Sequence, residues 1–287
     1  MRLGETFERF LQQAPISVMV RSLLERTLDP TEIDRLFEDS ATNQYTREIL
    51  FSSLIKLMAA VVCGVQPSIR AAYISSLGEI AASLSAVYEK LQGIELEVCR
   101  RLVTETAGKL EPVVHQLGAT LPQPVPGYRT KVLDGNHLAG TEHRIGPTRT
   151  TRAAVLPGQA LVVLDLATML VLDAVSCEDA YTQERALIEH VLPGVEPGDL
   201  WIEDRNFCTT RLVFGVRARG GSLLVRQHQS TLYWHETTPW VTVGRTGTGS
   251  VHEQTIRVHD PASDETRRSN CGASAWIWTS RPRTRRR

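Results

Sequence analysis

Apolar residues in the first part of the chain recur at three- and four-residue steps, the spacing of one face of an α-helix. The first such stretch lies between residues 5 and 26, and Pro15 is predicted to break it. A second helix is predicted to start at Asp29, which can act as its N-cap. Pro30 fits the first helical position and Glu32 lies in the first turn, so three neighbouring residues indicate the same start.

The helix that starts at Asp29 carries a stripe that we expect to be buried: Ile33, Leu36 and Phe37. Three further helices are predicted at residues 47–65, 67–91 and 95–117. The pattern therefore predicts a helical N-terminal domain over residues 1–120. Three prolines between residues 121 and 127 cannot sustain a helix, so a linker is predicted at residues 121–130.

After the linker the apolar pattern changes to short β-branched runs. Strands are predicted at residues 131–134, 160–166, 169–176, 199–204 and 222–227, and helices at 184–192 and 209–219. The second and third strands are expected to form a hairpin. Three strands followed by alternating helices and strands resemble the opening of an RNase H-like fold. We therefore predict an α/β chain, in which the helical region precedes an incomplete RNase H-like core at residues 131–227.

The last sixty residues are predicted to form two further segments. Short β runs over residues 228–268 indicate a β-rich insertion. Residues 269–287 contain five arginines and no acid, and without them 27 Lys and Arg face 32 Asp and Glu, a balance of −5. A basic tail for DNA is one interpretation of these residues. A frameshifted end of the gene is the interpretation we prefer, because one consistent choice of codons gives an alternating strand in another frame.

Composition indicates a cytoplasmic protein. The five cysteines show no metal-type pairing, which is typical of thiols in a reducing compartment. The first 13 residues carry charges throughout and lack the apolar core of a signal peptide. The longest apolar run, residues 57–65, is too short to span a bilayer, which needs about 20 residues.

Two aspartates carry the candidate chemistry. Asp134 and Asp204 each end a predicted apolar strand. If these strands are parallel neighbours, the two carboxylates lie close together and repel each other unless a cation separates them. Mg²⁺ (or Mn²⁺) prefers carboxylate oxygens, water and phosphate as ligands, and a pair of such ions can activate a nucleophile for phosphodiester chemistry. For either residue taken alone, a turn or a helix cap is the commoner role.

Neighbouring polar residues fit this site less well. Glu203 alternates with Asp204 along the strand, so we expect it to point to the opposite face and not to bind metal. Asp165 and Asp173 are predicted to lie at the ends of the hairpin, and His137 to make local hydrogen bonds.

Four segments resemble DDE transposases of the insertion-sequence-four type, the cut-and-paste family. Residues 132–138, Val-Leu-Asp-Gly-Asn-His-Leu, are similar to the strand with the family's first aspartate. Residues 198–209 contain Asp-Arg-Asn-Phe and are similar to the strand with the second. Residues 223–226 resemble the next strand, which often ends in arginine, and residues 85–94 resemble part of the helical region. The resemblance covers roughly residues 30–268.

The resemblance implies an RNase H-like catalytic domain that cuts and joins transposon-end DNA with divalent metal. It implies that Asp134 and Asp204 are metal ligands, and it makes Arg205 and Arg226 candidate contacts to DNA phosphates; a surface salt bridge is the alternative for both arginines. Because such transposases act on paired ends, it also implies a homodimer on double-stranded DNA.

One part of the family pattern is missing. The third acid of the family is a glutamate on a late helix that also carries tyrosine, arginine and lysine, and no such pattern occurs here. We therefore expect DNA strand cleavage to be absent or very low. Three alternatives to an inactive transposase remain at this stage: a DNA-binding regulator of transposition without catalysis, another RNase H-like nuclease with an unrecognised third acid, and a decaying gene product.

Overall fold

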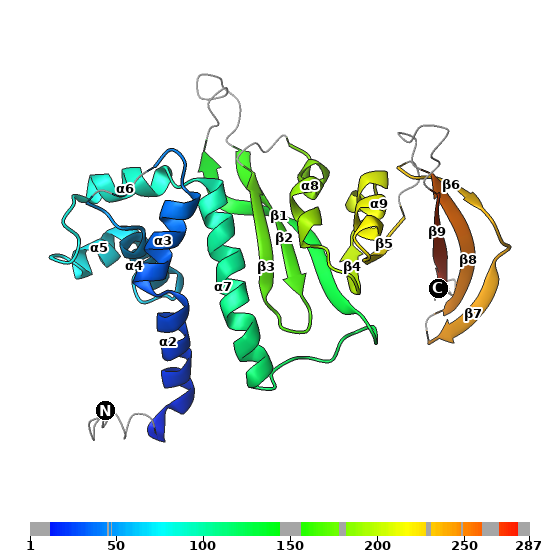
Figure 1. The fold of residues 1–287 in the computed structure, drawn as a ribbon, viewed down its shortest axis with the longest axis horizontal. Coiled ribbons are helices and arrows are strands. Elements are labelled where there is room, and N and C mark those ends of the chain that lie inside the picture. The colour runs from blue at the N-terminus through cyan, green and yellow to red at the C-terminus, as the bar shows by residue number, and fades with distance from the viewer. Residues whose placement is uncertain are drawn as a thin grey trace, which may run out of the picture. The chain divides into compact units, whose positions relative to one another are not determined.

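The computed structural model describes residues 12–44, 46, 48–143, 156–177, 182–227, 231–247, 249–259 and 270–280 (Figure 1). The chain divides into two compact units, each built from two separate segments. The first unit contains Met1–Pro122 and Gly135–Thr182. The second contains Gln123–Asp134 and Gln183–Arg287.

The N-terminal segment of the first unit is helical, as predicted. Its helices are α2 (Pro15–Thr27), α3 (Pro30–Ser40), α4 (Phe51–Val62), α5 (Ile69–Ser75), α6 (Leu84–Gln92) and α7 (Leu96–Gln116). Pro15 is the first residue of α2, which confirms the predicted break, whereas residues 5–11 of that stretch lie outside the described part of the chain. The predicted cap of α3 is also confirmed, because the Asp29 side chain accepts hydrogen bonds from the backbone N–H groups of Thr31 and Glu32.

The core of these helices forms where the predicted stripe of α3 meets α4. Ile33, Leu36 and Phe37 are all buried, and the rings of Phe37 and Phe51 stack with their centroids 5.0 Å apart. The predicted helix at residues 67–91 is wrong: α5 and α6 are two short helices with a non-helical segment between them that includes Gly78 at φ +96°. A positive φ is a conformation that glycine tolerates and that a continuous helix excludes.

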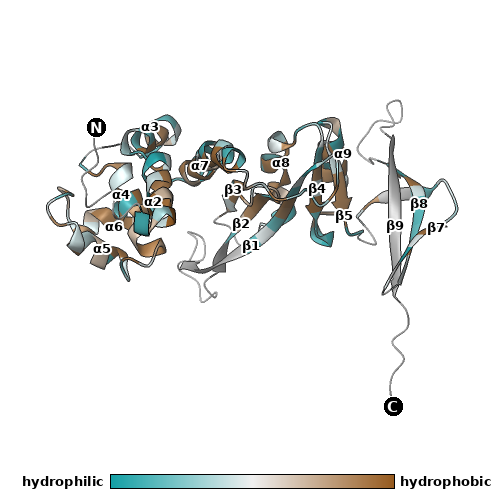
Figure 2. Ribbon diagram, turned by 90° about the horizontal axis from the view of Figure 1, so that it is seen from below, coloured by the Kyte–Doolittle hydropathy of each residue, from teal (hydrophilic) through white to brown (hydrophobic). Residues whose placement is uncertain are grey.

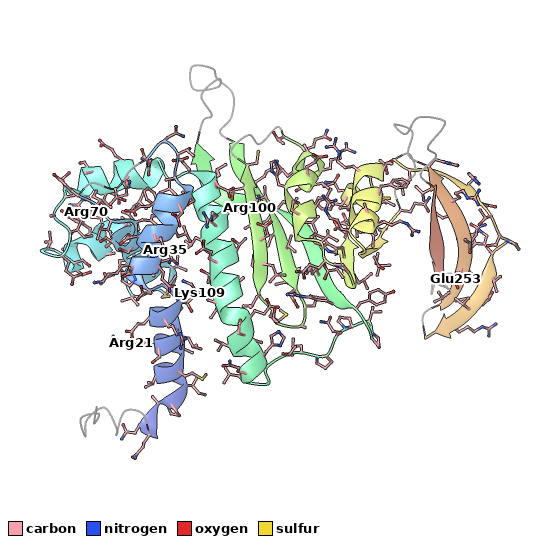
Figure 3. All side chains as sticks on the ribbon, in the orientation of Figure 1. Arg21, Arg35, Arg70, Arg100, Lys109 and Glu253 are labelled. Atoms are coloured by element: carbon pink, nitrogen blue, oxygen red, sulfur yellow. The ribbon has the colours of Figure 1, made fainter. Side chains whose placement is uncertain are left out.

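The second segment of the first unit supplies the predicted hairpin. Strand β2 (Leu156–Asp165) pairs in antiparallel register with β3 (Val171–Cys177). Asp165 is buried in the turn and accepts hydrogen bonds from the N–H groups of Ala167 and Thr168, so its role is structural. Helix α7 lies alongside β3, and its Arg100, labelled in Figure 3, points from the helix. Arg100 forms an ion pair with Asp173 of β3.

Five strands form a mixed sheet in the order β3-β2-β1-β4-β5. Strand β1 (Arg129–His143) pairs in parallel with β4 (Asp199–Glu203), and β4 pairs in parallel with β5 (Ser222–Val225). The chain is therefore of the mixed α/β class. Strand β1 belongs to both units, because the division falls between Asp134 and Gly135.

The helical elements of the second unit are short. The predicted helix at residues 184–192 is a 3₁₀ turn η2 (Glu184–Leu187), one turn of α8 (Ile188–Val191) and a 3₁₀ turn η3 (Leu192–Gly194). The turn η4 (Arg205–Phe207) follows β4, and α9 (Thr210–Ala218) begins after Thr209, whose side chain caps it by accepting a hydrogen bond from the N–H of Leu212. Trp201, Phe207 and Leu212 are buried in this unit. Hydrophobic residues lie along β4, α9 and the helices of the first unit (Figure 2).

A separate antiparallel sheet occupies the C-terminal region. It contains β6 (Tyr233–Glu236), β7 (Val241–Thr246), β8 (Gly249–His259) and β9 (Asn270–Ser280), with β8 paired to each of the other three. The β-rich character predicted for residues 228–268 is present, but the sheet extends beyond residue 268 because β9 pairs along the whole of β8. The arginine run at residues 281–287 lies outside the described residues. Among the described helices, none has the length and apolar character needed to cross a membrane.

Candidate functional site

The two predicted metal ligands come from neighbouring parallel strands of the same unit. In the β1–β4 pairing Leu133 lies opposite Glu203, so the next positions along the two strands are Asp134 and Asp204. Residues opposite each other in a parallel pair project from the same face of the sheet. Both aspartates are exposed. The predicted juxtaposition of the two strands is therefore present.

Asp134 does not end its strand, which corrects the sequence-based prediction. Strand β1 continues from Asp134 through Gly135 to His143. What ends at this point is the pairing with β4, whose last opposed pair is Leu133 and Glu203. The strand order places β1 between β2 and β4, and hydrogen bonds to β2 stabilise the extended chain beyond Asp134.

Asp204 follows β4 directly and forms an ion pair with Arg226, which follows β5. Nη2 of Arg226 lies 3.2 Å from Oδ1 of Asp204, and the side chains are 68% and 59% exposed. An ion pair this exposed contributes about 0–1 kcal/mol, so Arg226 can exchange the carboxylate for another anion at little cost. Arg205 is exposed at the start of η4. Arg205 and Arg226 are the two predicted contacts to DNA phosphates. The ion pair places the Arg226 side chain next to Asp204.

The sheet face that carries the aspartates is open to solvent. Leu224 of β5 lies opposite Ile202, so it shares the face of Asp204, and half of its surface is exposed. On the other face Lys131 donates a hydrogen bond to the carbonyl of Gly194 in η3, so the short helical elements cover that side. The aspartates therefore lie on the face opposite to η3.

Glu203 has a buried carboxyl group that the sequence analysis did not predict. It is 6% exposed, and among the described residues neither of its carboxyl oxygens has a hydrogen-bond partner. Burial, and after it the charge of Asp134, raises the pKa of Glu203 to about 9. The side chain is therefore a neutral acid at pH 7. Its alternation with Trp201, also buried, was a signal in the sequence that this acid faces the interior.

The other acidic residues considered in the sequence analysis lie away from Asp134 and Asp204. Asp165 and Asp173 belong to the first unit, where the first holds a turn and the second binds Arg100. The side chain of His137 lies outside the described residues. Within the described residues no three His, Cys, Asp or Glu side chains come together in a way that could hold a metal ion.

The carboxylates of Asp134 and Asp204 can supply some of the oxygen ligands that one Mg²⁺ needs. Mg²⁺ is commonly held by one or two carboxylates, with water and substrate phosphate completing its octahedron. Two exposed carboxylates at neighbouring strand positions supply that minimum. The pair of ions used in two-metal phosphodiester chemistry needs further oxygen ligands, and the described residues provide no third carboxylate at this place.

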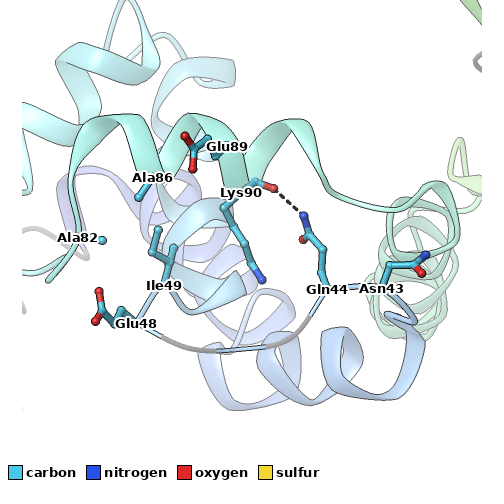
Figure 4. A pocket seen from close by; sticks show the side chains of 8 residues that line it. All are labelled: Asn43, Gln44, Glu48, Ile49, Ala82, Ala86, Glu89 and Lys90. Atoms are coloured by element: carbon cyan, nitrogen blue, oxygen red, sulfur yellow. Dashed lines mark hydrogen bonds between the residues drawn. The ribbon is translucent and has the colours of Figure 1, made fainter. Parts of the chain in front are cut away.

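A polar pocket of about 430 Å³ lies among the N-terminal helices (Figure 4). Its lining residues are Asn43, Gln44, Glu48, Ile49, Ala82, Ala86, Glu89 and Lys90. Nε2 of Gln44 donates to the carbonyl of Lys90 at 3.3 Å. Glu95 orders the adjoining loop by accepting hydrogen bonds from the N–H groups of Asn43 and Gln44, and from Thr42. These hydrogen bonds lower the pKa of Glu95 to about 2.

The chain was compared with protein families, curated proteins and solved structures. No family model matches the chain, and no curated protein matches it. Among solved structures it is similar to a piggyBac transposase in a synaptic complex with hairpin DNA, with 9% sequence identity and a TM-score of 0.32. The similarity covers 84% of this chain and 60% of that one, so the chain spans less than two thirds of the solved protein.

Proposed function

We propose that this chain is a transposase-type protein with an RNase H-like core, in which Asp134 and Asp204 bind one Mg²⁺ or Mn²⁺ and strand cleavage is absent or very low. The observation that carries the proposal is the β1–β4 register, which brings the two aspartates to neighbouring positions on an open sheet face. The strand order supports the core assignment, because an antiparallel hairpin precedes two strands that add in parallel to β1, as the RNase H-like prediction requires.

Low activity follows from the incomplete ligand set. A metal held by two carboxylates can polarise a phosphate oxygen when it is bound, but a second ion to stabilise the leaving oxygen needs more ligands than these. Arg226 holds part of Asp204's charge in an ion pair and competes further with the metal. We expect weak metal binding and no turnover of DNA.

Metal binding is tested with Mn²⁺ on the purified chain by isothermal titration calorimetry and by the electron paramagnetic resonance of free Mn²⁺. Asp134→Ala and Asp204→Ala should each weaken binding at least about 10-fold, a loss of roughly 1.4 kcal/mol. Asp39→Ala, at an exposed aspartate of the first unit, is the matched control and should leave affinity unchanged. Equal affinity in all four proteins would remove the site.

Cleavage is tested on labelled duplexes carrying the DNA that flanks the gene, in Mg²⁺ and in Mn²⁺. No nicking should be seen. Metal-dependent nicking that disappears in Asp134→Ala would mean that a third ligand is supplied and that the chain is an active enzyme.

A DNA-binding regulator is the second candidate, and the exposure of Arg205 and Arg226 beside Asp204 favours it. In a mobility-shift assay on the same duplexes, specific binding without cleavage would support this function. Replacing either arginine with alanine should then weaken binding to all sequences alike and reduce the slope of log affinity against log salt by about 1. Undetectable binding at low salt would argue against both candidate functions.

A further inference from the structure

Two histidines come together on the C-terminal sheet. Strand β6 pairs with β8 in antiparallel register, with Tyr233 opposite His259 and His235 opposite Arg257 (Figure 1). His235 and His259 are therefore diagonal neighbours, and both side chains project from the same face of the sheet. His235 is exposed and His259 is half-buried, so a small solute can reach the pair from solvent.

The spacing of the two imidazole rings matches that of two ligands on one metal ion. Nε2 of His259 lies 2.8 Å from Nδ1 of His235, and the ring centroids are 4.6 Å apart. Two imidazoles bound at a right angle, with metal–nitrogen bonds of about 2.0–2.1 Å, hold their nitrogens about 2.9 Å and their centroids about 4.5 Å apart. A tetrahedral angle would require about 3.3 Å and 5.1 Å. The observed spacing therefore fits the right angle.

Hydrogen bonds hold the chain after β6 on β8. Gln254 is 1% exposed, and its Nε2 donates to the carbonyl of Thr238 at 2.8 Å. The N–H of Thr255 donates to the hydroxyl of Thr238, and the N–H and hydroxyl of Thr237 both donate to the carbonyl of Thr255. The two strands are thus fixed to each other on either side of His235, and a bound ion would find its two ligands already positioned.

The chemistry of the pair selects the class of ion. Imidazole nitrogen suits Cu, Ni and Zn, whereas Mg²⁺, Ca²⁺ and Mn²⁺ prefer oxygen ligands. Nitrogens at a right angle are typical of tetragonal Cu²⁺ and Ni²⁺, and Zn²⁺ prefers a tetrahedron. Within the part of the chain that the structure describes, no third His, Cys, Asp or Glu joins the two histidines, so water would complete the coordination. The positive charge of Arg257 on the same face opposes cation binding and limits the affinity.

We propose that His235 and His259 bind one Cu²⁺ or Ni²⁺ ion, which joins β6 to β8. The ion takes the place of the hydrogen that links the two nitrogens, and each neutral ring keeps its hydrogen on its other nitrogen. This site shares no residue with Asp134 and Asp204, so the inference does not depend on the proposed function. The alternative is a hydrogen bond between the rings with no affinity for metal.

The test uses the full chain, purified without a histidine tag. The exposed thiols of Cys63 and Cys99 are first alkylated, because sulfur also binds these metals. Ni²⁺ affinity is measured by isothermal titration calorimetry, and His235→Ala and His259→Ala should each weaken it at least about 10-fold. The electron paramagnetic resonance of bound Cu²⁺ should show coupling to two imidazole nitrogens in the wild type, and this signal should be lost in both variants.

His252→Ala is the matched control. His252 lies on β8 but projects from the opposite face, where its Nδ1 is 3.0 Å from the Thr242 hydroxyl, so its removal should leave Ni²⁺ affinity unchanged. Arg257→Gln should tighten binding, because it removes a neighbouring cation. Asp134→Ala should keep the site, which separates this result from the failure of the proposed function.

His235→Gln and His259→Gln keep a hydrogen-bonding side chain and should lose the ion as the alanine variants do, and their circular dichroism spectra should match that of the wild type. Equal Ni²⁺ affinity in the wild type and in the variants of His235 and His259 would overturn the proposal. So would an equal loss in His252→Ala, or tighter binding of Zn²⁺ than of Cu²⁺.

Discussion

Arg100 donates two hydrogen bonds to Asp173, from Nε to Oδ1 and from Nη2 to Oδ2, and both are 2.8 Å long. This bidentate pair joins α7 to β3 within the first unit, and both side chains are largely removed from water. The planar guanidinium matches the carboxylate in geometry, which makes this arrangement stronger than a single contact. It ties the N-terminal helices to the hairpin.

Arg100→Ala should lower the free energy of unfolding by about 2–3 kcal/mol, because it leaves a partly buried carboxylate without its partner. The neighbouring Arg101 pairs with Glu105 one helical turn away and is more exposed, so Arg101→Ala should cost about 0.5 kcal/mol or less. Urea denaturation followed by circular dichroism measures both. Equal losses would mean that the pair with Asp173 adds nothing specific.

Lys131→Met should be more damaging. Nζ of Lys131 lies 2.7 Å from Oδ2 of Asp199, and both side chains are almost fully buried. Removing the ammonium leaves a buried charge that keeps its hydrogen bonds from the Trp201 indole and the Glu196 N–H, and a loss of about 3–5 kcal/mol is expected. Adding Asp199→Asn should recover part of the loss, since it removes the charge. A double variant no more stable than Lys131→Met would contradict this account.

Glu203 should make stability depend on pH. Its folded pKa is about 9, above the ordinary value of 4.5. Between these values the unfolded chain releases a proton that the folded chain keeps, so the free energy of unfolding falls as pH rises from about 4.5 to 9. Glu203→Gln should abolish this fall and stabilise the protein at pH 8 by on the order of 3 kcal/mol. Thermal melts at pH 5 and pH 8 measure it, with Glu38→Gln, at an exposed glutamate, as the control. Parallel pH profiles for wild type and Glu203→Gln would refute the assignment.

Glu95 should change the stability with pH in the opposite direction to Glu203. Its folded pKa of about 2 lies below 4.5, so its stabilising effect is present above the ordinary value and is lost as pH falls towards 2. The wild type should therefore lose more stability between pH 6 and pH 3 than Glu95→Gln, which lacks the titrating group. Melting temperatures at the two pH values provide the measurement, and a larger loss in Glu95→Gln would exclude the role.

Local signals in the sequence predicted the parts of the fold that depend on neighbouring residues. The cap at Asp29 and the buried stripe of α3 could be recognised because both arise within one or two helical turns. The hairpin and the parallel neighbours β1 and β4 followed from strand order. The length of β1 could not be predicted, because residues 135–143 are extended through pairing with β2, a contact distant in the sequence.

The two aspartates of the candidate site could be predicted from the sequence, but the contacts and burial of the residues around them could not. Asp134 and Asp204 stand at strand positions that the apolar pattern locates. The ion pair of Asp204 with Arg226 depends on β5 lying next to β4, and the burial of Glu203 depends on the elements that cover the far face. The ion pair is not encoded in local spacing. The spacing of Glu203 from Trp201 indicates which face of the sheet this acid occupies, but not which elements cover that face.

The division of β1 between the two units limits how the protein can be truncated and how its gene can recombine. Each unit is assembled from two stretches of chain, and one of the boundaries between the units lies directly after Asp134. No single truncation yields either unit intact, and a recombination event that exchanged one unit would need breakpoints after Pro122, Asp134 and Thr182. A gene fragment ending at residue 122 would encode the helices without their hairpin, and one starting at residue 183 would encode β4 without the strand that carries Asp134.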